Sequence, residues 1–445
     1  MTAATAVSPT TTTTTPNQAI DRYRAVRSWT EHLCAPLEVE DMVVQSMADA
    51  SPTKWHLAHT TWFFEVFLLE PHLPGYTTSN PTFHFLFNSY YNSLGQQYFR
   101  PDRGKISRPT VGEVRDYRQA VDEAMTTLLS TASEDTLATI SPLLDVGLNH
   151  EQQHQELIVT DLKHMFSKNP LFPVYRPEAS ATTADDTATS PVEWHAFDEG
   201  LYEIGIDASG DRFAYDNEGP RHKVWLEGFR IASRPVTCGE YLEFIADGGY
   251  DRPDPWLSAG WATVQEQGWR APLYWLQEDD GSWSIYTLAG KRPVRPEEPV
   301  THVSLYEADA FARWAGARLP TEPEWEVAAT HCLRDDHDRA LAAANLVDDG
   351  RFHPAAPTSD AARHGQWLGD VWEWTRSAYS PYPGYQPPAG ALGEYNAKFM
   401  NDQTVLRGGS CATPRSHLRA TYRNFFPSAT RWQFSGIRLA RDEIR

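Results

Sequence analysis

The hydrophobic pattern of this 445-residue chain changes at one short segment, and the change constrains the fold more than any other feature. Before residue 176, apolar side chains recur every three or four residues, which is typical of amphipathic helices. Residues 176–192 are rich in Ala, Thr, Asp and Pro, the composition of an interdomain linker. Of the 16 tryptophans, three precede residue 190 and 13 follow it, so the composition also changes near this segment. The sequence therefore predicts two domains of different construction.

The first half predicts a bundle of four helices over residues 17–175, preceded by a disordered, Thr-rich leader at residues 1–16. Four stripes of apolar residues at helical spacing define the expected helices: residues 20–33, 55–69, 111–129 and 142–165. The last of these is expected to begin near Pro142. The connection at 80–109 is long and rich in Tyr, Phe and Arg, and long ordered connections are usually functional.

The second half, residues 193–445, predicts an irregular α+β domain. Short runs such as HKVWLEGFRIA, residues 222–232, read as strands because Gly, Pro, Asp and Asn separate them. Helices are expected at only two places, residues 304–317 and 321–331. The complete fold class is thus an all-helical domain followed by an α+β domain.

Charge and cysteine content limit the partners and the compartment. The net charge is −20, from 39 Lys and Arg against 59 Asp and Glu, which argues against binding to nucleic acid or to anionic membranes. No apolar run reaches 18 residues, so no membrane span is expected, and the N-terminus lacks the pattern of a signal peptide. The four cysteines show no CxxC spacing, which favours reduced thiols in the cytoplasm.

The motif HEQQHQE, residues 150–156, is the strongest chemical signal in the chain. Its histidines, His150 and His154, stand at i and i+4 on one helix face, and the apolar stripe runs through both positions. This spacing predicts a metal site, with a pair of buried structural histidines as the alternative. The motif also fits the H-E-x-x-H helix of zinc peptidases, but His164 follows at a spacing that does not match the extended form of that motif.

A third ligand has two candidates in the second predicted helix, His56 and His59. His59 shares the stripe of Trp55 and Trp62, whereas His56 points about 60° away at 100° per residue. Spacing therefore favours His59. Three histidines suit zinc, copper or iron about equally, so composition does not choose the metal.

Several dense motifs of the second half resemble the formylglycine-generating-enzyme (sulfatase-modifying factor) domain, a C-type-lectin-like fold, over most of residues 195–441. They are DNEGPRHKV (216–224), RPVTCGEYLEFIADGGY (234–250), ARLPTEPEWEVAA (317–329), GDVWEWT (369–375) and VLRGGSCATPRSHLRATYRNFF (405–426). Catalytic members of that family bind copper through a cysteine pair, whereas Cys411 stands alone here. The resemblance therefore implies the fold without the copper chemistry.

The first half, with PTKWHLAHTTWFFE (52–65) and HEQQHQE, looks like a DinB-type four-helix bundle. A DinB-like bundle fused to this second domain resembles the ergothioneine-biosynthesis sulfoxide synthases, a family of non-haem iron enzymes. The resemblance implies that His59, His150 and His154 bind Fe(II). It also implies an O2-dependent reaction that joins the sulfur of a thiol donor to carbon 2 of the imidazole of hercynine and leaves a sulfoxide.

The same resemblance suggests how the substrates bind. Asn424 and Phe425 match the family's pair at the hercynine site, where an aromatic face attracts the trimethylammonium group. Gln153 is expected to orient the substrate imidazole or a ligand. The subtype that uses γ-glutamylcysteine has an acidic residue where this chain has Phe426, which favours free cysteine as the donor.

The donor's carboxylate needs a cation, and Arg100 and Arg103 in the long connection are the candidates because guanidinium groups bind carboxylates in a forked geometry. The reaction also needs a proton donor, which a tyrosine can supply. The Tyr-Tyr pair of the cysteine-using subtype corresponds to Tyr90 and Tyr91, with Tyr379 in the second domain as a reserve.

Two other functions are also compatible with the sequence. The 5-histidylcysteine sulfoxide synthases of ovothiol biosynthesis share both domains but usually carry a C-terminal methyltransferase, for which this sequence shows no glycine-rich motif, so hercynine is favoured over histidine. The second domain's fold also serves non-catalytic recognition modules, because fold alone does not fix function. Such a module has no need of three metal-binding histidines.

Overall fold

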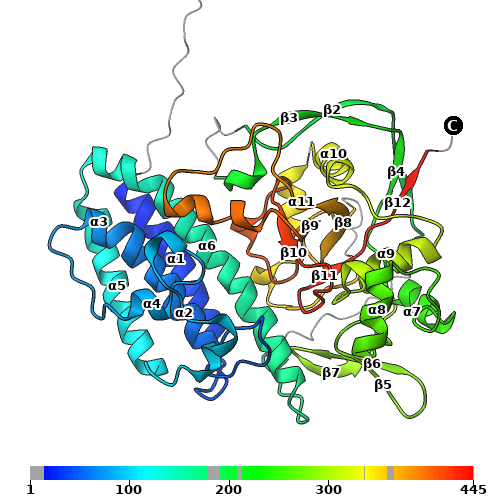
Figure 1. Ribbon diagram of the computed structural model, residues 1–445, viewed down its shortest axis with the longest axis horizontal. Coiled ribbons are helices and arrows are strands. Elements are labelled where there is room, and N and C mark those ends of the chain that lie inside the picture. The colour runs from blue at the N-terminus through cyan, green and yellow to red at the C-terminus, as the bar shows by residue number, and fades with distance from the viewer. Residues whose placement is uncertain (1–14, 178–190, 208–212, 335, 358–364, 444–445) are drawn as a thin grey trace, which may run out of the picture.

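The computed structural model contains a helical domain and a mixed domain that lie side by side, coloured blue to cyan and green to red in Figure 1. The linker predicted at 176–192 and the leader predicted at 1–16 lie mostly outside the described residues. The structure describes residues 15–177, 191–207, 213–334, 336–357 and 365–443.

Four long helices form the first domain, as the sequence predicts. They are α1 (Pro16–Cys34), α2 (Thr53–Phe64), α5 (Val111–Thr131) and α6 (Glu134–Ser167). Helices α1 and α2 each pack against both α5 and α6. A π-helical turn (Glu65–Leu69) and α3 (Glu70–His72) continue α2, and the long connection holds α4 (Phe83–Leu86) and short 3-10 turns at Asn92–Leu94 and Arg100–Lys105.

Helix α6 begins eight residues earlier than the sequence predicts, at Glu134 instead of near Pro142. The Ser133 side chain caps it by accepting a hydrogen bond from the amide of Thr136. Pro142 removes one backbone donor, but the apolar residues before it are buried and hold this turn in the helix. At 34 residues, α6 is about 50 Å long and reaches from the bundle into the second domain (Figure 1).

Helices α2 and α6 approach each other closely at Gly147, one turn before His150. A Cβ atom at this position would lie 2.6 Å from Phe64 Cε1 and 3.0 Å from Phe63 Cε1. Every residue of α2 is buried, so these rings have little room to move. The absence of a side chain at residue 147 therefore sets the separation of the two helices.

We expect a Gly147→Val variant to lose about 1–3 kcal/mol of unfolding free energy in urea titrations, because overpacking forces side chains and backbone to shift. Gly112→Val is the matched control, since a Cβ atom at Gly112 meets only Thr110 Oγ1, at 3.9 Å. Equal midpoints for both variants would show that the contact at Gly147 does not set the helix spacing.

In its described residues, the second domain contains four small sheets surrounded by loops and helices. Their strand orders are β1-β4-β12, β2-β3, β5-β6-β7 and β10-β9-β8-β11. The strands are β1 (Trp194–Phe197), β2 (Gly200–Ile204), β3 (His222–Leu226), β4 (Phe229–Ala232), β5 (Trp275–Gln277), β6 (Trp283–Thr287), β7 (Gly290–Pro293), β8 (Trp372–Ala378), β9 (Thr404–Arg407), β10 (Asn424–Phe426), β11 (Ser435–Gly436) and β12 (Ala440–Asp442).

The two predicted helices of this domain are present as α9 (Leu305–Trp314) and α10 (Glu322–Leu333). The expectation of only two was wrong, because the structure adds α7 (Cys238–Ala246), α8 (Ser258–Gln267) and α11 (His337–Ala343). Helix α7 did carry a readable start signal: Thr237 and Glu240 form a capping box. No described helix is long and apolar enough to cross a membrane.

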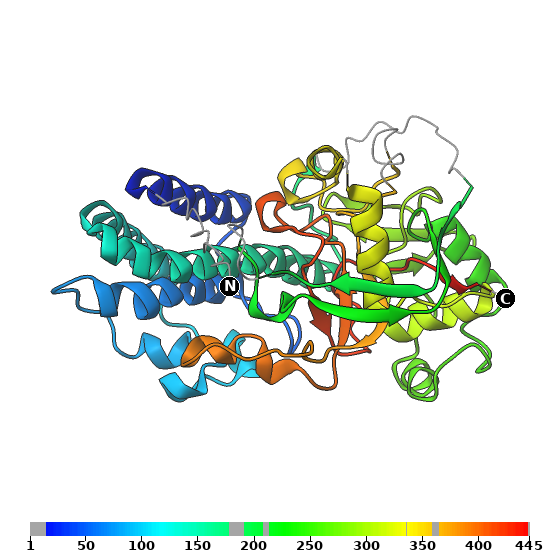
Figure 2. The ribbon, with the colours of Figure 1, turned by 90° about the horizontal axis from the view of Figure 1, so that it is seen from above.

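The domains contact each other along α6 and through the long connection of the bundle. Glu156 of α6 accepts hydrogen bonds from Trp372 Nε1, Ser410 Oγ and Thr413 Oγ1 at 2.6, 2.8 and 3.0 Å. Glu394 accepts the backbone amides of residues 92 and 93, both at 2.9 Å. In Figure 2 the orange part of the second domain lies along the helical domain. The edge strand β10 lies near α6, because residues 424–426 line the same cavity as Gln153 and Glu156.

Candidate metal centre and substrate cavity

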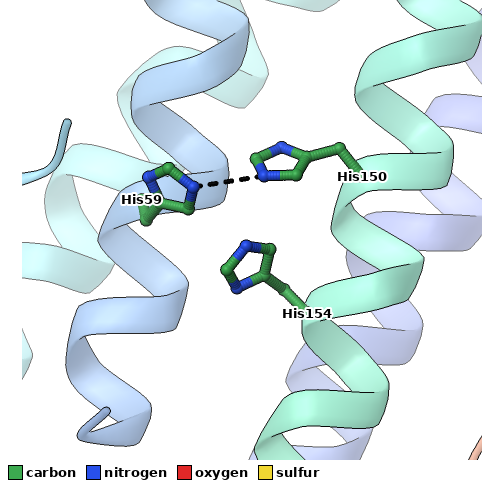
Figure 3. Close-up of side chains that lie close together, drawn as sticks. All are labelled: His59, His150 and His154. Atoms are coloured by element: carbon green, nitrogen blue, oxygen red, sulfur yellow. Dashed lines mark hydrogen bonds between the residues drawn. The ribbon is translucent and has the colours of Figure 1, made fainter. Parts of the chain in front are cut away.

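Three histidines meet in the interior of the bundle (Figure 3): His59 from α2, and His150 and His154 from α6. One ring nitrogen of each lies within 4.8 Å of the others, and all three side chains are buried. The Nε2 atoms of His59 and His150 are 3.1 Å apart. Within the part of the chain that the structure describes, this is the one group of three or more His, Cys, Asp or Glu residues close enough to hold a metal ion.

Burial keeps these imidazoles neutral. It lowers the pKa of His150 to about 3 and lowers the pKa values of His59 and His154 well below their usual range. Neutral imidazoles present nitrogen lone pairs at pH 7, which metal binding requires. The Phe87 carbonyl oxygen lies 2.5 Å from Nδ1 of His59, so Nδ1 donates to it and Nε2 is free to face the cluster.

Two tryptophans hold the ring of His59. Trp55 stacks on it at 4.6 Å between centroids and 14° between planes, and Trp62 at 5.6 Å and 16°. These are the residues that share its stripe in the sequence. The stacking limits rotation of the imidazole, so its nitrogen is aimed before any ligand binds.

The structure places His59 in the cluster and His56 outside it, in agreement with the spacing. His56 is nevertheless buried and contacts the cluster from behind. Its Nδ1 lies 2.8 Å from Nδ1 of His154, and its Nε2 lies 3.0 Å from Asp161 Oδ2. The sequence stripe missed this contact because His56 reaches His154 from a different face of α2.

Glu151 cannot act as the base of a zinc peptidase, although it occupies the Glu position of H-E-x-x-H. Its Oε1 accepts from Arg118 and Thr30, both at 2.6 Å, and its Oε2 accepts from Arg27 at 2.9 Å. Burial would raise the pKa of Glu151, but the two arginines outweigh it and hold the pKa at about 2. The carboxylate is a fixed structural anion that joins α1, α5 and α6.

A cavity of about 300 Å³ lies between α6 and the second domain. It brings together five of the residues that the sequence nominates for substrate binding: Arg100, Gln153, Asn424, Phe425 and Phe426. Gln153 is fixed from the second domain, because its Nε2 donates to the Tyr422 hydroxyl at 2.8 Å and its Oε1 accepts from the Tyr395 hydroxyl. The cavity therefore borders the residue next to His154.

Comparisons with known proteins agree with this two-domain site. The Sulfatase-modifying factor enzyme 1-like domain matches residues 185–443, and the DinB superfamily matches residues 22–158. The hercynine oxygenase of Mycolicibacterium smegmatis is 35% identical over 424 residues, which cover 88% of this chain and 91% of that protein. The chain belongs to the hercynine oxygenase family.

A second hercynine oxygenase, from Mycobacterium tuberculosis, is 33% identical over 411 residues, with 88% of this chain and 91% of that protein covered. Ergothioneine biosynthesis protein 1 of Schizosaccharomyces pombe is 27% identical over 234 residues, with 52% of this chain and 28% of that protein covered. Membership of the hercynine oxygenase family makes this chain an oxidoreductase with a DinB-like helical domain and a sulfatase-modifying-factor-like domain.

Three tyrosines of this chain, Tyr90, Tyr91 and Tyr395, form a cluster beside the three histidines. The Tyr90 and Tyr91 rings are 4.7 Å apart, and Tyr91 is fully buried against Trp62 at 5.7 Å. The sequence did not single out Tyr395, whose ring centroid lies 5.6 Å from that of His150 and 6.1 Å from that of Tyr90. Burial raises the pKa values of Tyr90, Tyr91 and Tyr395, so their hydroxyl groups are protonated at neutral pH.

Tyr379, the reserve candidate, lies outside this cluster and stacks on Phe425 with ring centroids 4.0 Å apart.

The two arginines nominated for the donor differ in environment. Arg100 is exposed, lines the cavity and donates to the backbone carbonyl of Asp49. Arg103 is only 3% exposed, lies 3.4 Å above the Trp55 ring, and donates to the hydroxyls of Ser51 and Ser89 at 2.9 and 3.1 Å. Among the described residues no carboxylate forms an ion pair with it.

Proposed function

We propose that the chain is a non-haem Fe(II)- and O2-dependent sulfoxide synthase of ergothioneine biosynthesis. It would join the sulfur of cysteine to carbon 2 of the hercynine imidazole and release hercynylcysteine sulfoxide. The observation that carries the proposal is the cluster of three neutral imidazoles together with a cavity, built from both domains, that is lined by Gln153, the residue between His150 and His154 on α6. The four free cysteines agree with a cytoplasmic location.

His59, His150 and His154 fit Fe(II), because three buried nitrogen donors suit a first-row divalent ion and leave positions open on it. Iron bound there would supply the activation of O2. The residues of the chain have two further roles. Trp55 and Trp62 orient the His59 ring and the buried helices α2 and α6 carry the three imidazoles, while the second domain forms one wall of the cavity.

Hercynine would bind against β10. The Phe425 ring lines the cavity and can attract the trimethylammonium group, although Tyr379 stacks on it with ring centroids 4.0 Å apart; Phe399, 5.9 Å away, adds a second aromatic ring to the cavity wall. Asn424 offers an amide to the carboxylate. Gln153, held by two tyrosine hydroxyls, would orient the imidazole toward the histidines.

Free cysteine fits the rest of the cavity better than γ-glutamylcysteine. Phe426 and Trp432, with rings 5.2 Å apart, form an apolar wall where the longer donor needs an acidic partner. Asp49 and Arg100 line the same cavity and offer the opposite charges that the ammonium and carboxylate of an amino acid require. Tyr90 and Tyr91 are the proposed proton donors, and the Tyr395 ring contacts both Tyr90 and His150.

An Arg100→Gln variant should raise the KM for cysteine about 10- to 100-fold and leave the KM for hercynine nearly unchanged, because Arg100 lines the cavity and hydrogen bonds to a charged group contribute about 1.5–3 kcal/mol. Its melting temperature should stay close to that of wild type, since the Arg100 side chain is exposed and its protein partner is one backbone carbonyl. Steady-state kinetics check the two KM values, and thermal melts check the stability. Equal increases in the two KM values would remove Arg100 from the donor site.

The direct test is oxygen uptake by Fe(II)-loaded protein with pairs of substrates. We expect uptake with hercynine plus cysteine and formation of the sulfoxide by mass spectrometry. Uptake with hercynine plus γ-glutamylcysteine, and none with hercynine plus cysteine, would contradict the interpretation that Phe426 marks a cysteine-using enzyme. Uptake only with histidine plus cysteine would instead assign the chain to ovothiol-type chemistry.

A further inference from the structure

A line of three buried polar side chains runs away from the metal centre: His154, His56 and Asp161. His154 and Asp161 are two turns apart on α6, and His56 reaches between them from α2. We propose that His56 and Asp161 are positioning residues that fix the proton of His154 and strengthen it as a metal ligand. The proposal rests on the metal site described above.

The direction of each hydrogen bond follows from the acceptor at the end of the line. A carboxylate can only accept, so Nε2 of His56, 3.0 Å from Asp161 Oδ2, carries the proton of the His56 ring. Nδ1 of His56 is then bare and must accept from Nδ1 of His154, 2.8 Å away. The remaining nitrogen of His154, Nε2, therefore has a free lone pair. In Figure 3 one ring nitrogen of His154 points toward the other two imidazoles and one points away.

The three imidazoles differ in what lies behind them. His59 donates to a neutral carbonyl, that of Phe87. Nδ1 of His150 is buried with no hydrogen-bond partner among the described residues. Among the described residues, His154 alone of the three is linked by hydrogen bonds to an anion, through the His56 ring, and a charged acceptor polarises such a chain of donors more strongly than a neutral one. His154 is thus the strongest electron donor of the three, and the site has one ligand that differs from the others.

Asp161 is itself held in place. Its Oδ2 also accepts the backbone amide of Ser51 at 2.8 Å, just before α2 begins, and the side chain is only 7% exposed. The carboxylate therefore ties the start of α2 to α6 and presents a fixed oxygen to His56. If Asp161 served only as this structural tie, its mutation would lower the stability of the protein but would not change the affinity or the potential of a bound metal.

The test compares Fe(II) affinity and the Fe(III)/Fe(II) midpoint potential in wild type and Asp161→Asn. Asparagine keeps the shape and can still accept from Ser51, but it removes the charge. We expect Fe(II) affinity to fall about 10- to 100-fold, the range typical for partners of metal ligands, and the potential to become more positive. His56→Phe should show changes in the same direction and at least as large. His164→Phe is the matched control, because His164 lies on α6 but bonds Ser46 instead.

Wild-type affinity and potential in Asp161→Asn, with only a changed melting temperature, would overturn the proposal. If Asp161→Asn fails to fold, His56→Phe, which removes both hydrogen bonds of the His56 ring, gives the same readouts; unchanged values there would also overturn it. Wild-type protein that binds no Fe(II) would instead overturn the metal site, and the positioning role with it. The two failures are therefore distinguishable.

Discussion

Replacing His154 by alanine should reduce oxygen uptake with hercynine and cysteine by more than about 100-fold. Loss of a partner behind a ligand already lowers metal affinity or activity 10- to 100-fold, and this change removes the ligand itself. The variant would also leave His56 without its hydrogen bond at the cluster. We expect iron content by elemental analysis to fall together with the activity, because both depend on the same nitrogen.

The fold should survive this change. His154 is one buried side chain in a bundle whose helices are held along their whole length, so far-UV circular dichroism should match wild type. His164→Ala on the same helix is the control and should retain both iron and activity. Full activity in His154→Ala would refute the iron assignment, and loss of helical signal would make the activity result uninformative about ligation until a His154→Gln variant is measured.

The second large effect is on stability. A Glu151→Gln variant should lose about 3–5 kcal/mol of unfolding free energy, because it leaves Arg27 and Arg118 buried without their shared carboxylate. Glutamine would also turn an amide NH2 toward one of the guanidinium groups. Asp145→Asn, at a half-exposed ion pair with Arg22 on the same helix, is the matched control and should change stability by less than about 1 kcal/mol.

The effect of Glu151→Gln should depend on pH in a defined direction. The folded pKa of about 2 lies below the ordinary value of 4.5, so the carboxylate contributes its full stabilisation above pH 4.5. That contribution is lost as the pH falls toward 2. Urea titrations of wild type and variant should therefore converge below pH 4.5, whereas a gap that stays constant down to pH 2 would show that packing causes the loss.

The sequence could predict the cluster of three histidines because its members follow the same rule as the core. His59, His150 and His154 lie on apolar stripes, and the stripe of a bundle helix faces inward. That rule also separated His59 from His56. The division into two domains could be read for a similar reason, since helical periodicity and short, Gly- and Pro-separated runs are properties of neighbouring residues.

What the sequence could not predict depends on residues that meet only after folding. His56 lies off the stripe, yet α6 brings His154 and Asp161 to both of its ring nitrogens. Tyr395 comes from a loop more than 240 residues away from His150, and no local pattern marks it. Pro142 was misleading for the opposite reason: a local helix-breaking signal was overridden by the buried residues around it.

The order of the two domains has a consequence for the protein as it is made. All three cluster histidines belong to helices that end by Ser167, whereas the cavity wall on β10 is more than 250 residues further along. At about 5–20 residues per second, and with N-terminal domains folding first, roughly 13–50 seconds separate the two parts on the ribosome. The nascent bundle therefore presents the three imidazoles of the proposed iron site before the proposed substrate cavity is complete, so under the proposed function iron would be able to bind before the chain is finished.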